Sequence, residues 1–209
     1  MGAVCMRRFV YLFALTVGVS GVSGCISLVS APTTNTTTYV LSPPPPAVAT
    51  EQGGGNQVLY VAHATAPAYL DGTRIVFSRD DLTRNSYQYA QWAEPLPARL
   101  TTLLVEALAA TNHFKAVTRQ TGVAAPDLAL TLEVLDFRHV AGTLPGEATV
   151  TLRATLSDRH GGEIVEALTV SKHVPLTAGT ARAAVTALGE ATAQSIAAIV
   201  AMVVAARSH

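Results

Sequence analysis

The chain has few cysteines and no excess of charge of either sign. Cys5 and Cys25 are its two cysteines, and its 14 basic side chains are matched by 14 acidic ones. Proteins that bind nucleic acid usually carry clustered positive charge, so this balance argues against nucleic acid as a partner. With so few thiols the fold has to rest on a hydrophobic core, and 49% hydrophobic residues are enough to build one.

Recognisable catalytic and metal-binding motifs are also missing. The sequence has no Cys-x-x-Cys pair, no phosphate-binding P-loop, no dinucleotide glycine fingerprint and, in the mature chain, no Gly-x-Ser-x-Gly elbow. Asp136 and His139 are close enough in sequence to supply two members of a catalytic triad, but no serine is marked as the third. We therefore predict that the protein is not an enzyme and uses neither a cofactor nor a metal ion.

The first segment has the order of a secretory signal. A short basic stretch precedes an almost unbroken apolar run over residues 9–19, and small residues at 22–24 then lead to Cys25. This end resembles the bacterial lipobox, in which the chain is cut before the cysteine and the cysteine is acylated. The sequence therefore predicts a signal peptide over residues 1–24 and lipidation of Cys25. The alternative is an ordinary secretory signal followed by a coincidental cysteine.

Residues 25–57 are typical of a flexible tether. A threonine-rich run, the prolines at 43–46 and the glycines at 53–55 cannot bury enough apolar area to offset the entropy lost on ordering. A flexible chain of this length has a relaxed span of about 30 Å. Within it, Tyr39-Val40-Leu41 is a short apolar island, for which we favour docking on the domain as an edge strand over a loose conformation.

Residues 58–209 predict one domain of the α+β class. Apolar and polar side chains alternate over residues 128–137 and again over 148–156, which is typical of antiparallel strands with one solvated face. The alternation slips by one residue at Leu135, which predicts a bulge or a bend there.

Two segments with helical spacing complete this domain. Leucines over residues 96–108 follow prolines suited to the first turn of a helix, and an apolar stripe runs over residues 185–203. Residues 196–206 are apolar almost all round, but a membrane span needs about 20 such residues, so we favour a helix lying across a sheet over a transmembrane end. The expected fold is an antiparallel sheet with two main helices packed on one face, preceded by a signal peptide and a flexible tether.

Aromatic side chains are scarce but concentrated. They make up 6% of the chain, yet residues 67–72 and 87–96 together hold three tyrosines and the single tryptophan. Amphipathic rings gathered in loops and short strands are common in protein contact surfaces. The partner-binding residues that we predict are Pro67, Tyr69, Leu70, Tyr89 and Trp92. The alternative is that these rings cover one end of the core.

Three short motifs and the leader carry a resemblance to a known family. A lipobox leader is followed in order by Tyr39-Val40-Leu41, by Pro67-Ala68-Tyr69-Leu70-Asp71-Gly72 and by Trp92-Ala93-Glu94-Pro95-Leu96. In this the chain resembles the ABC-type transport auxiliary lipoproteins, the PqiC-like family, over most of its mature length. The C-terminal half matches by pattern only.

The resemblance implies a function that composition does not reveal. Such proteins partner with an MCE-domain protein and an ABC permease complex that moves phospholipids or other hydrophobic molecules between the two membranes of Gram-negative bacteria. They have no catalytic site, and some assemble into rings, so a homo-oligomer is a further expectation. Ile26, rather than Asp, follows the cysteine, which implies the periplasmic face of the outer membrane. The alternative is a structural lipoprotein of another envelope assembly or secretion complex.

Overall fold

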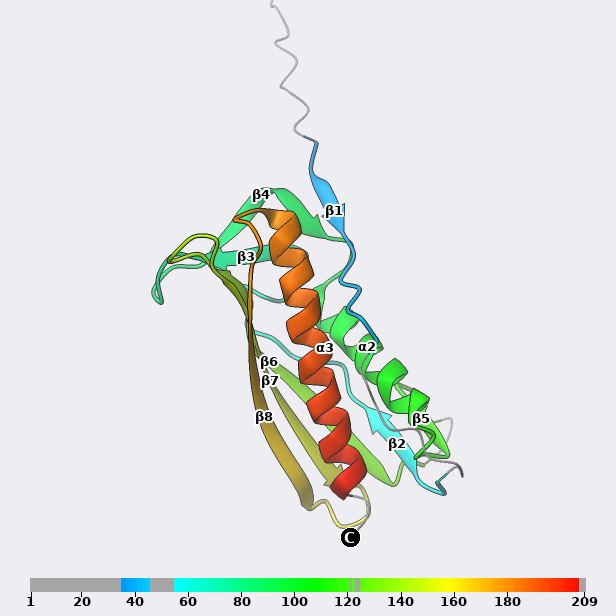
Figure 1. Ribbon diagram of the computed structural model, residues 1–209. Helices are drawn as coiled ribbons and strands as arrows, with labels where there is room; N and C mark the ends of the chain where they lie inside the picture. The colour runs from blue at the N-terminus through cyan, green and yellow to red at the C-terminus, as the bar shows by residue number, and fades with distance from the viewer. Residues whose placement is uncertain (1–34, 46–54, 121, 123–124, 207–209) are drawn as a thin grey trace, which may run out of the picture. The chain divides into compact units, whose positions relative to one another are not determined.

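One long strand, β6 (Leu128–Val140), organises the sheet (Figure 1). On one edge β6 pairs antiparallel with β7 (Glu147–Asp158), and β7 pairs antiparallel with β8 (Ile164–Pro175). The computed structural model describes residues 35–45, 55–120, 122 and 125–206; the predicted signal peptide and Cys25 lie outside the described residues.

Two short strands share the other edge of β6. β2 (Val58–Val61) pairs parallel with its beginning and β3 (Arg74–Ser78) pairs parallel with its end. β5 (Ala116–Thr118) then adds to β2, while β4 (Asn85–Trp92) and β1 (Thr37–Tyr39) add to β3 in that order.

The α+β class is confirmed, but the sheet is mixed rather than wholly antiparallel. Among the described strands, β1–β4, β2–β5, β2–β6 and β3–β6 are parallel pairs. The reason is that β2 and β3 reach β6 through long connections, both of which contain a helix. A hairpin, which would impose antiparallel pairing, does not join either of them to β6.

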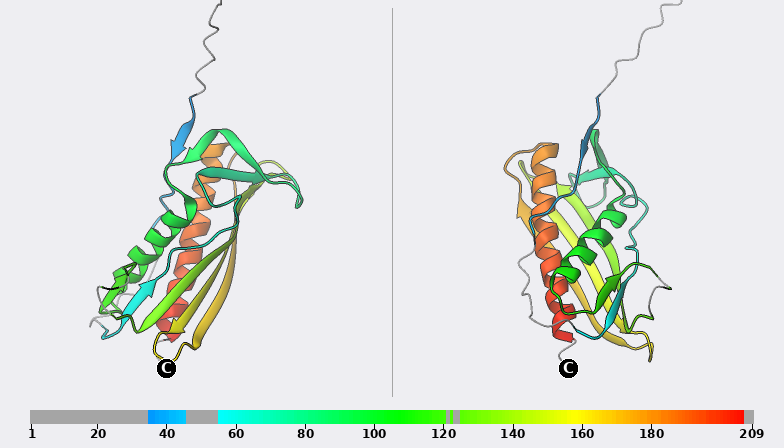
Figure 2. Two further views of the ribbon diagram at one scale, coloured as in Figure 1. Left: turned by 180° about the vertical axis from the view of Figure 1, so that it is seen from behind. Right: turned by 90° about the vertical axis from the view of Figure 1, so that its right-hand side faces the viewer.

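Both helices lie on the same face of the sheet (Figures 1 and 2). Helix α2 (Leu96–Ala110) contacts β5 and helix α3 (Ala181–Ala206), and α3 packs across β7 and β8. The side chains of β7 that face the helices are fully buried: Ala148, Val150, Leu152, Ala154 and Leu156. By length and composition α3 could cross a membrane, but 56% of its most apolar window is buried in the domain, as expected of a core helix.

The predicted bulge is present in β6. Val134 pairs with Leu152 and Asp136 pairs with Thr151, so Leu135 is an extra residue on β6. Side chains before the bulge, such as Val134, and after it, such as Phe137, therefore face the same core.

The Tyr39-Val40-Leu41 island docks on the domain, as we favoured. Residues 37–39 pair parallel with residues 90–92 of β4, which makes β1 an edge strand. Leu41 is buried, and the Nε of Arg99 donates a hydrogen bond of 2.8 Å to its carbonyl oxygen. This part of the predicted tether is therefore attached to the domain.

Gly146 provides a test of the turn between β6 and β7. Its φ is 85°, and a Cβ there would collide with the carbonyl oxygen of Val140 and lie 2.7 Å from the Nε2 of His139. We expect Gly146→Ala to lower the free energy of unfolding by about 2 kcal/mol or more, because both the backbone angle and the contact are unfavourable. Urea unfolding followed by circular dichroism measures this.

Gly72→Ala is the matched control. A Cβ at Gly72 would meet nothing within 4 Å, so the free energy of unfolding should change by less than about 1 kcal/mol. Equal losses in the two variants would contradict the turn geometry.

Candidate docking surface

The three sequence motifs meet at one junction. They come from β1, from the turn that precedes β3, and from the end of β4 with the start of α2. Three backbone N–H···O hydrogen bonds close the junction: Ala93 to Tyr39 (2.8 Å), Trp92 to Thr73 (2.7 Å) and Leu96 to Gly72 (3.1 Å). Segments 19 to 54 residues apart in sequence are thus tied by backbone groups.

The large side chains of these motifs fill the interior of the junction. Leu70 and Trp92 are each only 3% exposed, and the Trp92 ring stands edge-on to Phe137 with centroids 6.2 Å apart. This corrects the surface role that we predicted for Leu70 and Trp92. Both side chains belong to the core. For these two residues the alternative interpretation, in which the side chains cover one end of the core, describes the structure.

The other predicted partner-binding residues reach the surface. Tyr89 is 51% exposed and Pro67 is exposed as well. Tyr69 is half-buried, and the guanidinium of Arg84 lies 5.9 Å from the centroid of its ring. Partner binding by Pro67, Tyr69 and Tyr89 stays a prediction.

An irregularity in β4 presents the tyrosines. Ser86 of β4 pairs with Val76 of β3, and Gln91 pairs with Arg74. Between these two pairs β4 covers five residues, whereas β3 covers only two. The additional residues include Tyr87 and Tyr89. Tyr87 turns inward, where burial raises the pKa of its hydroxyl, whereas Tyr89 remains exposed.

The buried histidine of β6 is a structural group. His139 is 2% exposed; its Nδ1 lies 2.7 Å from the hydroxyl of Tyr87 and its Nε2 lies 3.0 Å from the carbonyl oxygen of Pro145. Both ring nitrogens are therefore used to hold β4 and the β6–β7 turn. The sequence alone could not distinguish this role from a catalytic one.

The triad suggested by sequence spacing does not form. Asp136 lies on the opposite face of β6 from His139, because successive side chains of a strand alternate. It faces Arg138, whose Nε is 3.1 Å from its Oδ2. Burial raises the pKa of Asp136, and the charge of Arg138 opposes that rise. Within the described parts of the chain, no three His, Cys, Asp or Glu side chains are grouped to hold a metal ion.

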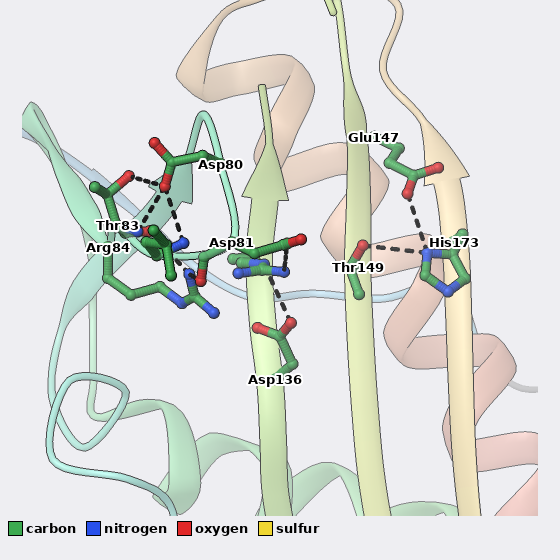
Figure 3. Close-up of polar contacts among 10 residues, drawn as sticks. Asp80, Asp81, Thr83, Arg84, Asp136, Glu147, Thr149 and His173 are labelled. Carbon is green, nitrogen blue, oxygen red and sulfur yellow. Dashed lines mark hydrogen bonds and ion pairs between the residues drawn. The ribbon is translucent and has the colours of Figure 1, made fainter. Parts of the chain in front are cut away.

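A network of polar contacts shapes the β3–β4 loop on this face (Figure 3). One carboxylate oxygen of Asp80 accepts hydrogen bonds from the N–H groups of Leu82 (3.0 Å) and Thr83 (2.7 Å) and from the Thr83 hydroxyl (2.8 Å). The bonds from Thr83 lower the pKa of Asp80. On the neighbouring strands His173 bridges Glu147 and Thr149, with Nδ1 3.2 Å from an oxygen of each. These side chains make this face polar.

A hollow of about 550 Å³ lies where the β3–β4 and β6–β7 loops approach each other. Phe77, Tyr87, His139 and Leu144 form part of its wall. At the tips of the two loops Leu82 is 96% exposed and Leu144 is 81% exposed. Sequence reasoning missed both leucines, because a single apolar residue within a polar loop has no periodic pattern to mark it.

The described residues of this region offer exposed side chains for contact. Exposed apolar side chains surround the end of the domain at which β1 enters, whereas the titratable groups described above are engaged with one another. Such a surface suits a partner or a membrane.

Comparison with protein families gives one match over most of the chain. The model of the family described as "ABC-type transport auxiliary lipoprotein component" matches residues 39–200, a range that contains all three junction motifs. No curated protein matches the sequence.

Solved structures share the fold. Protein XCC0632 from Xanthomonas campestris has a TM-score of 0.72 and 23% identity, with 82% of this chain and 97% of that chain covered. The hypothetical protein CT253 from Chlamydia trachomatis has a TM-score of 0.53 and 12% identity, with 75% of this chain and 100% of that chain covered. At these identities the likeness establishes the architecture and not the activity.

Trp92 and Tyr89 allow a direct test of which aromatic side chain is structural. We expect Trp92→Ala to lower the free energy of unfolding by about 3–5 kcal/mol, because it leaves a cavity against Phe137. Tyr89→Ala should change it by less than about 1 kcal/mol, because half of its side chain already faces water. Thermal and urea unfolding of the two variants measure this, and a Trp92→Ala protein as stable as the parent would refute the assignment.

Proposed function

The chain belongs to the ABC-type transport auxiliary lipoprotein family, and on that premise we propose that it is the auxiliary, non-catalytic subunit of a system that moves phospholipids between the two membranes of a Gram-negative cell. In this proposal it is anchored at the periplasmic face of the outer membrane and docks an MCE-domain protein that works with an ABC permease. The observation that carries the proposal is the family match over residues 39–200.

Lipid on Cys25 would provide the attachment. The small residues before Cys25 and Ile26 after it support removal of residues 1–24, acylation and an outer-membrane destination. A single acyl chain anchors a protein marginally and two or more anchor it firmly, so an acylated cysteine needs no transmembrane helix.

The packing of β1 shortens the reach that the sequence predicted. Asn35 is the first described residue, and it lies only ten positions (35 − 25) after Cys25. Ten residues extend to at most about 36 Å and relax to about 16–19 Å. The domain would therefore work close to the membrane that holds it, which suits delivery of an apolar cargo across a short gap.

The exposed aromatic edge is the proposed docking site for the MCE-domain protein. Tyr89 is presented by the irregular part of β4, next to the edge strand β1, and Pro67 and the half-buried Tyr69 belong to the adjoining junction. Tyrosine offers a large contact area at small cost in conformational entropy, and it is enriched among the residues that dominate interfaces. The backbone hydrogen bonds of the junction tie β1 to the end of β4, next to Tyr89.

Site-specific photo-crosslinking in cells tests this docking site. With a photoreactive amino acid in place of Tyr89 in the full-length, lipidated protein, we expect a crosslink to an MCE-domain protein, identified by mass spectrometry. The matched control carries the photoreactive residue at Glu163, which is exposed in the turn between β7 and β8 and far from β4; it should not crosslink to that protein.

Two results would count against the proposal. A crosslink from Tyr89 to another envelope assembly or secretion protein would replace lipid transport with a structural role in that complex. A crosslink to the MCE-domain protein from Glu163 but not from Tyr89 would move the docking site to the other end of the domain.

A further inference from the structure

The two loops beside the hollow each present one leucine to solvent. Leu82 stands in the β3–β4 loop and Leu144 in the β6–β7 loop, and we call them the leucine tips. The loops are neighbours: the N–H of Ala141 donates a hydrogen bond of 2.7 Å to the carbonyl oxygen of Ser78, and Figures 1 and 2 show the loops side by side. The two loops therefore meet at their bases.

The exposure of Leu82 is built into its loop. The three hydrogen bonds to Asp80 form a tight turn around it (Figure 3), and the Nη1 of Arg84 donates to the carbonyl oxygens of Asp81 and Thr83. The Asp81 carboxylate lies 3.6 Å from the guanidinium of Arg138 on β6. A loop fixed at its base in this way keeps its apolar tip in water, a position that a flexible loop could avoid.

Leu144 is held by equally specific contacts. The carbonyl oxygen of the next residue, Pro145, is bound by His139, and the turn ends at Gly146, where no side chain fits. The Cδ2 of Leu144 would lie 3.1 Å from a Cβ added at Gly179, so this leucine also rests against the segment that precedes α3. Most of its side chain nevertheless faces solvent.

The leucine tips and β1 lie at opposite ends of the β3–β4 pair, because β1 pairs with residues 90–92 whereas Leu82 precedes Asn85. Of the six large hydrophobic side chains exposed in the described residues, four are on β4, on the two loops or directly after β1: Val40, Leu82, Tyr89 and Leu144. The other two, Ile164 and Val165, begin β8, directly after the turn between β7 and β8.

We propose that Leu82 and Leu144 insert into the surface of the lipid bilayer to which Cys25 is anchored, which rests on the lipid anchor of the proposed function. Asn35 lies ten positions after Cys25, which keeps Asn35 within about 36 Å of the bilayer. At that distance the anchor supplies a high effective concentration, so two leucines that would bind a membrane weakly alone suffice to orient the domain. The third fixed point is the chain entry at β1.

The scarcity of cysteine makes the test simple. Cys5 leaves with the predicted signal peptide and Cys25 is acylated, so a cysteine introduced at one position is the single free thiol of the mature chain. Leu82→Cys, Leu144→Cys and the control Ile164→Cys are each labelled with the environment-sensitive fluorophore NBD. The lipidated full-length proteins are reconstituted into vesicles of phosphatidylethanolamine and phosphatidylglycerol, and acylation of Cys25 is verified by intact mass.

We expect NBD emission at positions 82 and 144 to shift to shorter wavelength and to be quenched by spin-labelled lipids, while position 164 behaves as it does in water. Adding Leu144→Asp to the Leu82→Cys protein should reduce the shift at position 82, because both tips act on one orientation. Adding Ile164→Asp instead should leave the shift unchanged.

The possible results distinguish insertion of the leucines from acylation of Cys25. Acylated protein on vesicles whose labels at 82, 144 and 164 all report water would overturn insertion and leave the proposed function standing. Protein that is not acylated would overturn both. A shift at 82 and 144 that arises only after the MCE-domain protein is added would also overturn insertion, because the leucines would then be covered by protein.

Discussion

The extra residue in β6 is the constraint on which the packing of β4 and of the β6–β7 turn depends. A one-residue slip in a strand reverses the face of every later side chain. If Leu135 were accommodated without a bulge, Asp136 and Arg138 would point into the core, and Phe137 and His139 would point to the polar face. Because of the bulge, Phe137 packs against Trp92. His139 likewise contacts the hydroxyl of Tyr87 and the carbonyl oxygen of Pro145. The positions of β4 and of the β6–β7 turn both follow from it.

The bulge also helps to determine which side chains are buried and which are exposed at this end of the domain. The core side of β6 anchors the junction of the three motifs, whose buried side chains and backbone hydrogen bonds define where β1 enters. The side chains left outside this junction, above all Tyr89 and the leucine tips, are exposed on a rigid base. A protein that holds a partner near a membrane needs such a base, because ordering the surface on binding would reduce affinity. Motifs typical of a family can thus be structural while the contacts are made by residues beside them.

Local patterns predicted the parts of the fold that depend on local chemistry. The alternation on β6 and β7, the slip at Leu135 and the apolar stripe of α3 were all readable, because side-chain period follows directly from strand and helix geometry. Docking of residues 39–41 was favoured for a similar reason, since three apolar residues in a polar segment gain from burial. The parallel pairing of β2 and β3 with β6 was not readable, because it depends on how distant segments connect.

The site was harder to predict than the fold. Clustering of aromatic residues could not tell Trp92, which packs inward on Phe137, from Tyr89, which faces solvent. That distinction depends on the irregular register between β3 and β4. No sequence pattern marks Leu82 and Leu144, because what they have in common is that their loops are neighbours in space. The two loops are about 60 residues apart in the sequence.

We propose that this protein serves an ABC-type lipid transport system at the membrane that holds its acyl chains. The most direct test is isolation of the full-length lipidated protein from chemically cross-linked envelope membranes, with mass spectrometry of what accompanies it. We expect to recover an MCE-domain protein together with an ABC permease. Recovery of only outer-membrane assembly or secretion proteins would contradict the proposal.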